Sequence, residues 1–237
     1  MIPYPIGAFQ LIPAIILMAY GVTKQKSVQP YFDMLVMALP ATLFYGPLMR
    51  NLTGGLFEWY FYFIAKFALF LVPGLVLIQV RNYELREFGI TKEGLRLSLL
   101  LGFGILILTT ITSATTFLLN PATTQSNLWD FTIPSNILLI SVPLFFEAFN
   151  EEFMFRGVFF FFAYKNTKNV ALSYIVSMMV AFAWHPEFTL FRMVPVFVQG
   201  TLLCYLLYKS KNIHGAWISH GINRTTGSLV ARFLMMN

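Results

Sequence analysis

The sequence predicts an all-α membrane protein with about eight transmembrane helices. Of its 237 residues, 57% are hydrophobic and only 11% are charged, whereas soluble domains carry about 25% charged residues. The apolar residues form eight runs, most of them close to the roughly 20 residues that a spanning helix needs. One water-soluble core cannot bury so much apolar surface, so these observations predict a polytopic membrane protein.

The eight predicted spans follow one another through short polar connections. Residues 1–134 hold the first four spans and residues 135–237 hold the other four, and we expect both parts to form one integral membrane domain. We see no soluble domain, internal repeat or low-complexity segment. The predicted spans are Ile6–Val22, Tyr31–Met49, Leu56–Val80, Leu97–Leu119, Ser135–Ala163, Val170–His185, Phe188–Tyr208 and Ile213–Met235.

The basic residues between the spans predict an orientation. The connections after spans one, three, five and seven hold ten Lys and Arg residues, whereas the even-numbered connections hold Arg50 and, at the start of span seven, Arg192. Cytoplasmic loops are enriched in Lys and Arg. We therefore expect the odd-numbered connections in the cytoplasm and both termini outside, in a multi-pass protein of the cell membrane that contacts membrane lipids.

Charge and cysteine content exclude other classes of protein. The net charge is +6, but the basic residues flank apolar runs instead of forming a patch interleaved with aromatic residues, so no nucleic-acid partner is expected. The single cysteine, Cys204, excludes an internal disulfide.

The fifth apolar run contains a cluster of ionisable residues. A charge at the centre of a bilayer costs about 2.5–3.5 kcal/mol on insertion scales, so such residues usually face a protein interior or a water-filled cavity and mark a functional site. The alternative is a structural charge network that holds helices together. The cluster consists of Glu147, Glu151, Glu152 and Arg156.

Helical spacing separates the roles of these four residues. Residues four apart share a helix face. Glu147 and Glu151 are therefore expected on one face, and Glu152 and Arg156 on another. Glu152 precedes its basic partner in the order that favours an ion pair, which predicts that Arg156 neutralises Glu152. Glu151 is then left for another role. A carboxylate in an apolar site beside a second carboxylate is suited to act as a general base.

Two histidines and an amide fall in later spans. His185 ends the sixth span, His220 lies inside the eighth, and Asn223 follows it by three residues. Together with Glu151, these residues suit two kinds of site. Glu151, His185 and His220 could bind zinc with an open position for water. Alternatively, without metal, the carboxylate and one histidine activate a water while the other histidine and the amide stabilise an oxyanion.

These residues resemble the motifs of a known family, the CAAX-processing and bacteriocin-processing (CPBP) family of intramembrane proteases, which includes the type II CAAX prenyl endopeptidases. Glu151-Glu152-x-x-x-Arg156 is similar to its first motif. Phe182 with His185, and His220 with Asn223, resemble its second and third motifs. The resemblance covers roughly residues 135–226.

The resemblance implies roles for these residues. Glu151 would activate water with help from His185, and His220 with Asn223 would stabilise the oxyanion. Glu152 and Arg156, with Glu147 nearby, would shape the site.

The sequence also departs from the family pattern at two positions. Ala181 stands where the family usually has Phe, four residues before the motif histidine. Arg224 stands where the family usually has Asn or Asp, four residues after the other histidine.

The predicted function is therefore that of an intramembrane endopeptidase, either metal-dependent or glutamate-dependent. It would hydrolyse a peptide bond of a membrane-associated or prenylated substrate, the prenylated substrate being implied by the resemblance alone. Two alternatives remain open at this stage. One is a small proton-coupled transporter, since buried Glu, His and Lys also form proton relays. The other is a catalytically silent scaffold or immunity-type membrane protein, which the two motif departures favour.

Overall fold

The computed structural model describes residues 11–43, 56–119, 134–183 and 190–236, and this part of the chain is helical without any strand. The prediction of an all-α protein is therefore confirmed, and each predicted span overlaps at least one helix. The elements are α2 (Ile12–Thr23), α3 (Gln29–Leu43), α4 (Leu56–Phe70), α5 (Val72–Val80), the 3₁₀-helix η3 (Leu85–Phe88), α6 (Leu95–Leu119), α7 (Pro134–Glu152), the π-helix η5 (Phe153–Phe162), α8 (Ala163–Thr167), α9 (Val170–Ala183), α10 (Leu190–Ser210) and α11 (His214–Met236).

Two of the predicted spans are not single α-helices. The third span divides at Leu71 into α4 and α5, and Pro73 lies in the first turn of α5. Proline is tolerated there because the N–H that it lacks would have no partner within the helix. The fifth span changes from α7 to the π-helix η5 directly after Glu152, and all ten residues of η5 are buried. π-Helical segments are rare and occur frequently at functional sites.

Two stretches among the described residues have the length and composition of candidate membrane spans. Tyr60–Val80 and Leu95–Thr112 are long and apolar enough to cross a membrane, and α2 and α9 are apolar but shorter. Helix α7, in contrast, carries charged residues that the interior of the bundle buries.

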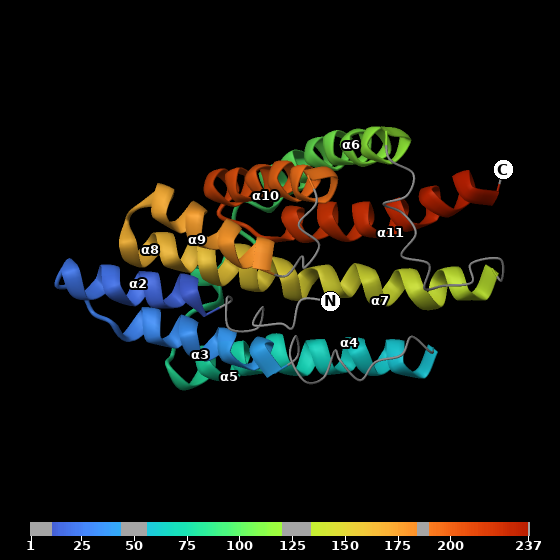
Figure 1. The fold of residues 1–237 in the computed structure, drawn as a ribbon. Coiled ribbons are helices and arrows are strands. Elements are labelled where there is room, and N and C mark those ends of the chain that lie inside the picture. The colour runs from blue at the N-terminus through green and yellow to red at the C-terminus, as the bar shows by residue number, and fades with distance from the viewer. Residues whose placement is uncertain (1–10, 44–55, 120–133, 184–189, 237) are drawn as a thin grey trace.

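The helices place α7 and η5 at the centre of the bundle (Figure 1). Helix α7 lies between α4 on one side and α11 on the other, and α11 also packs against α6. The π-helix η5 packs against α9, α10 and η3. Its Phe162 ring stacks on Phe88 of η3 at a centroid distance of 4.5 Å. The charged residues of α7 therefore face both the N-terminal and the C-terminal halves of the chain.

The four basic connections meet at one end of the bundle. Each of them is joined to another by a hydrogen bond from a side chain to a backbone carbonyl. The bonds run from Lys26 Nζ to Thr167 O at 2.8 Å, from Lys165 Nζ to Arg86 O at 3.4 Å and from Asn212 Nδ2 to Glu93 O at 3.0 Å. Burial lowers the pKa of Lys165 in this group.

Helices α6 and α11 approach each other at glycine. A Cβ atom on Gly215 would lie 1.9 Å from the backbone oxygen of Ser98, and one on Gly102 would lie 2.5 Å from the backbone oxygen of Gly215. Gly215 N donates a hydrogen bond to Ser98 Oγ at 2.9 Å. Small residues allow such close approach between membrane helices. This contact holds the start of α11, and so the position of His220, against the bundle.

Replacing Gly215 with alanine is expected to destabilise the protein. The added methyl group has no space, and overpacking of this kind costs about 1–3 kcal/mol. Thermal denaturation in detergent measures the effect. Gly104→Ala is the matched control in the same helix pair, because a Cβ on Gly104 meets no described atom within 4 Å. Equal melting temperatures for the two variants would contradict the close contact.

Candidate active site

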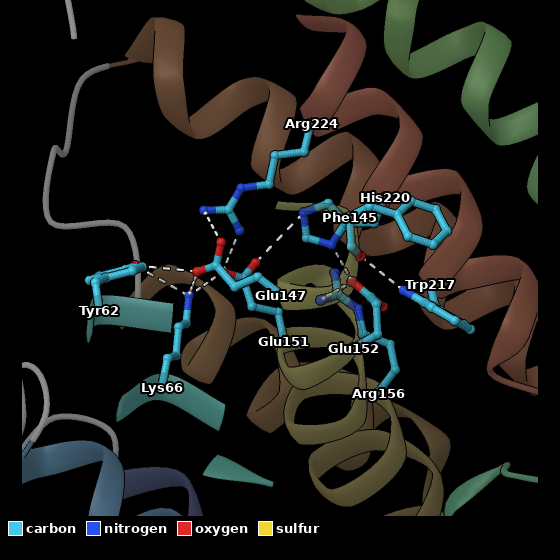
Figure 2. Close-up of polar contacts among 10 residues, drawn as sticks. All are labelled: Tyr62, Lys66, Phe145, Glu147, Glu151, Glu152, Arg156, Trp217, His220 and Arg224. Atoms are coloured by element: carbon cyan, nitrogen blue, oxygen red, sulfur yellow. Dashed lines mark hydrogen bonds and ion pairs between the residues drawn. The ribbon is translucent and has the colours of Figure 1, made fainter. Parts of the chain in front are cut away.

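Six charged side chains from four helical elements converge on α7 (Figure 2). Three are carboxylates of α7, and three are cations supplied by α4, η5 and α11. All except one cation are less than 10% exposed. The carboxylates belong to Glu147, Glu151 and Glu152, and the cations belong to Lys66, Arg156 and Arg224.

Lys66 and Arg224 hold the first two carboxylates from opposite sides. Lys66 Nζ contacts Glu147 Oε1 and lies 2.7 Å from Glu151 Oε1. Arg224 Nη2 lies 3.0 Å from Glu147 Oε2, and its Nη1 lies 2.7 Å from Glu151 Oε1. The Tyr62 hydroxyl adds a hydrogen bond to Glu147 Oε1 at 3.2 Å. Both cations thus bridge the two carboxylates that one helix face brings together.

Glu152 has different partners. Arg156 Nη1 lies 3.3 Å from Glu152 Oε1, so the predicted ion pair is present, although η5 replaces α-helix between the two residues. His220 Nδ1 lies 2.7 Å from the same carboxylate oxygen. Glu152 therefore links η5 to α11 and fixes the plane of the His220 ring.

His220 lies between the two groups of carboxylates. Its other ring nitrogen, Nε2, is 3.6 Å from Glu151 Oε2. A carboxylate only accepts hydrogen bonds, so a neutral His220 ring carries its proton on Nδ1 toward Glu152 and leaves Nε2 as an acceptor. Helix packing supports this position, because a Cβ on Gly221 would lie 2.7 Å from the Phe145 ring of α7.

The six charges balance. Three carboxylates face three cations, so a neutral His220 leaves the cluster without net charge. Buried charges are tolerated when they are paired and hydrogen-bonded, and loss of one partner is strongly destabilising. The cluster is therefore held together as a unit, and each partner constrains the position of Glu151.

The structure brings some of the predicted site residues together, but not all of them. Glu147, Glu151, Glu152, Arg156 and His220 are brought together, whereas His185 lies outside the described residues. Asn223 is half-buried, and its side chain forms no hydrogen bond within the described part of the chain. The next residue, Arg224, occupies the site instead.

Two cations of the site were not among the predicted site residues. For Lys66, the signal in the sequence is a lysine in the middle of an apolar span. The structure joins Lys66 to Glu147. Another buried carboxylate, Asp33, pairs with Arg81 at 3.2 Å and accepts a hydrogen bond from Tyr83. Burial, together with that hydrogen bond, raises the pKa of Tyr83.

Comparison with known proteins agrees with the motifs. Residues 133–226 match the family described as Type II CAAX prenyl endopeptidase Rce1-like, a family of integral membrane peptidases. The match confirms the resemblance predicted from the sequence and extends from the start of α7 to the middle of α11. Among curated proteins and solved structures, none matched the chain. Arg224 lies inside the matched segment, and Lys66 lies outside it.

The described residues do not form a zinc site. They contain no group of three His, Cys, Asp or Glu side chains that could hold a metal ion. Of the predicted ligands, Glu151 and His220 are adjacent, but Glu151 Oε1 is held by Lys66 and Arg224. A dication at this oxygen would have to displace two cations that already neutralise the carboxylate.

Proposed function

We propose that the protein is an intramembrane endopeptidase that hydrolyses a peptide bond of a membrane-associated or prenylated substrate. The observation that carries the proposal is the approach of the His220 imidazole to the Glu151 carboxylate, with Nε2 and Oε2 3.6 Å apart. The family match supports it. The proposal includes a multi-pass protein of the cell membrane with eight spans, residues 1–134 and 135–237 forming one membrane domain.

A water molecule can be held between these two groups. A water at about 2.8 Å from both Glu151 Oε2 and His220 Nε2 would donate one hydrogen bond to each. Glu152 keeps the imidazole in place through Nδ1, which fixes both the ring plane and the acceptor nitrogen. The water is thereby oriented with one proton toward the general base.

Hydrolysis then proceeds in two steps. The water oxygen forms a bond to the carbonyl carbon of the substrate, and its proton passes to Glu151. The tetrahedral intermediate collapses as the C–N bond breaks, and the proton on Glu151 is delivered to the departing amine nitrogen. The products are a new carboxylate and a new amino terminus. His185, which the family motif implies as a helper of Glu151, belongs to this proposal as a prediction.

Cleavage of a farnesylated CAAX peptide by the protein purified in detergent tests this function. Mass spectrometry should detect release of the last three residues, with cleavage directly before the aliphatic pair. Activity without a sealed membrane is expected of a peptidase and not of a proton-coupled carrier. Absence of cleavage for prenylated peptides and for other membrane peptides would contradict the proposal.

The same assay addresses metal dependence. Since Lys66 and Arg224 already neutralise the Glu151 carboxylate, prior treatment with a strong chelator is expected to leave the cleavage rate unchanged. Loss of activity that returns on addition of zinc would contradict the metal-free mechanism while leaving the peptidase assignment in place.

A further inference from the structure

A charged pocket of about 600 Å³ lies at the end of the bundle where the basic connections meet. Its volume falls in the range of about 300–1,000 Å³ that is usual for ligand pockets. Three carboxylates and three cations line it, so both signs of charge are available to one ligand. The charged lining residues are Glu84, Glu87, Glu93, Arg86, Lys165 and Lys211.

Only part of this charge is paired within the protein. Arg86 forms an ion pair with Glu84 at the edge of the pocket. Lys165 Nζ lies 3.4 Å from the backbone oxygen of Arg86, which is a neutral partner. Within the described part of the chain, neither Lys165 nor Lys211 forms an ion pair, and neither does Glu93. Two ammonium groups and one carboxylate thus remain for a ligand.

An apolar groove of about 340 Å³ runs between α9 and α10. The buried side chains of Phe160 and Cys204 line it, together with the exposed ring of Tyr205. At one end of the groove, the hydroxyl groups of Tyr174 and Thr201 are hydrogen-bonded to each other at 2.8 Å. Because these hydroxyls already satisfy each other, the groove favours an apolar occupant.

The pocket and the groove are adjacent. Phe160 lines the groove, and the next residue, Phe161, lines the pocket. Tyr208 lines the groove and Tyr164 lines the pocket, and the centroids of these two rings are 5.6 Å apart. The groove reaches the basic end of the bundle, because α9 starts there and α10 ends there. One molecule with a charged head and an apolar chain can therefore occupy both cavities.

We propose that the two cavities form a binding site for phosphatidylethanolamine, a membrane lipid whose headgroup carries one phosphate and one primary ammonium. Lys165 and Lys211 bind the phosphate, and the Glu93 carboxylate accepts hydrogen bonds from the ammonium. One acyl chain lies in the groove between α9 and α10. Hydrogen bonds between charged groups are about twice as strong as neutral ones. The inference goes beyond the proposed peptidase function and does not depend on it.

The charge balance of the pocket selects this headgroup. An anionic lipid would bring its negative charge to a lining that holds three carboxylates, and Glu93 would face it without a cation. Phosphatidylcholine also has a phosphate, but its quaternary ammonium has no N–H to donate to a carboxylate. The chain positions the lipid and adds little selectivity, because a chain in the bilayer is surrounded by apolar groups in any case.

Competitive lipid binding in detergent tests the proposal. Protein stripped of lipid is mixed with equal amounts of phosphatidylethanolamine, phosphatidylcholine and phosphatidylglycerol that carry identical acyl chains. Native mass spectrometry then measures the fraction of protein bound to each lipid. Phosphatidylethanolamine should be preferred over each competitor by about tenfold, which is the effect of one hydrogen bond between charged groups.

Variants of the pocket identify the headgroup contacts. Glu93→Gln should remove the preference for phosphatidylethanolamine, and Lys211→Met should weaken binding of all three lipids by about tenfold. Lys92→Met is the matched control, because Lys92 is exposed in the same connection as Glu93 but does not line the pocket. Equal melting temperatures of these variants would show that the fold is intact in each.

A variant of the groove tests the place of the acyl chain. Ala171 lines the groove and is exposed, so Ala171→Trp fills the groove without disturbing the core. It should lower retention of phosphatidylethanolamine by displacing the chain. Ile175→Trp is the matched control, since Ile175 is exposed on the same helix but does not line the groove, and it should bind the lipid as wild type does.

Three results would overturn the inference. Equal retention of the three lipids by the wild-type protein would show contact with lipid in general, and a preference for phosphatidylglycerol would show a site for anionic lipid. Wild-type binding by Glu93→Gln or by Ala171→Trp would show that the lipid does not occupy both cavities. None of these measurements involves peptide cleavage, so failure of the protein to cleave peptides would overturn the proposed function and leave this inference standing.

Discussion

Replacing Glu151 with glutamine is expected to lower the rate of peptide hydrolysis by orders of magnitude in protein that remains folded. The amide keeps the shape of the side chain and an oxygen for Lys66 to contact, but it cannot take a proton from water. A general base contributes about 10²–10⁴-fold to the rate, so kcat should fall by that factor. Single-turnover cleavage of the farnesylated peptide measures the loss without interference from product release.

Two further variants separate the general base from the charge network. Glu147→Gln removes one negative charge from the same two cations. Among the described residues, His220 contacts Glu151 and Glu152 instead of Glu147, so the loss of rate should be much smaller. Glu93→Gln changes an exposed carboxylate outside the cluster and should leave the rate unchanged. If Glu147→Gln and Glu151→Gln lowered kcat equally, the network as a whole, and not the Glu151 carboxylate, would set the rate.

Replacing Lys66 with methionine is expected to have the largest effect on stability. Lys66 is 1% exposed and contacts two carboxylates at once. Removal of one partner from a buried ion pair costs about 3–5 kcal/mol, because the remaining charges stay buried without compensation. The variant should accumulate poorly in membranes and unfold at a markedly lower temperature in detergent. Lys92→Met, at an exposed position, is the matched control.

A double-mutant cycle checks the cause of this loss. Combining Lys66→Met with Glu147→Gln removes one positive and one negative charge, which restores the balance of the cluster. The double variant should therefore be more stable than Lys66→Met alone, and the difference gives the coupling energy of the pair. Stabilities that simply add would show that Lys66 acts through packing of its side chain instead.

Local patterns in the sequence were sufficient for the fold class and for part of the site. Apolar runs predicted helices, and each predicted span overlaps at least one observed helix, because hydrophobic length is a property of the local sequence. The Glu152–Arg156 pair followed from the four-residue spacing. The buried cluster on α7 followed from the cost of leaving charge in an apolar segment. The predicted number of membrane spans depends on which of these helices cross the bilayer.

Other features required contacts between distant residues. Lys66 is 81 residues from Glu147, and Arg224 is 73 residues from Glu151. No local spacing predicts such partners. The π-helix was also missed, since α-helical periodicity was assumed throughout the fifth span, whereas η5 is buried on all sides against α9, α10 and η3.

Asn223 and Arg224 illustrate the difference between what local sequence predicts and what helix packing decides. Adjacent residues on a helix point about 100° apart, so the sequence placed both near His220 without deciding which one faces the carboxylates. The rotation of α11 decides it, and close packing at Gly215 and Gly221 constrains that helix against α6 and α7. The sequence by itself determined the helices, the charged residues and the family resemblance. Only the tertiary structure determined which charges meet, because their partners come from helices that are separated along the chain and brought together by packing.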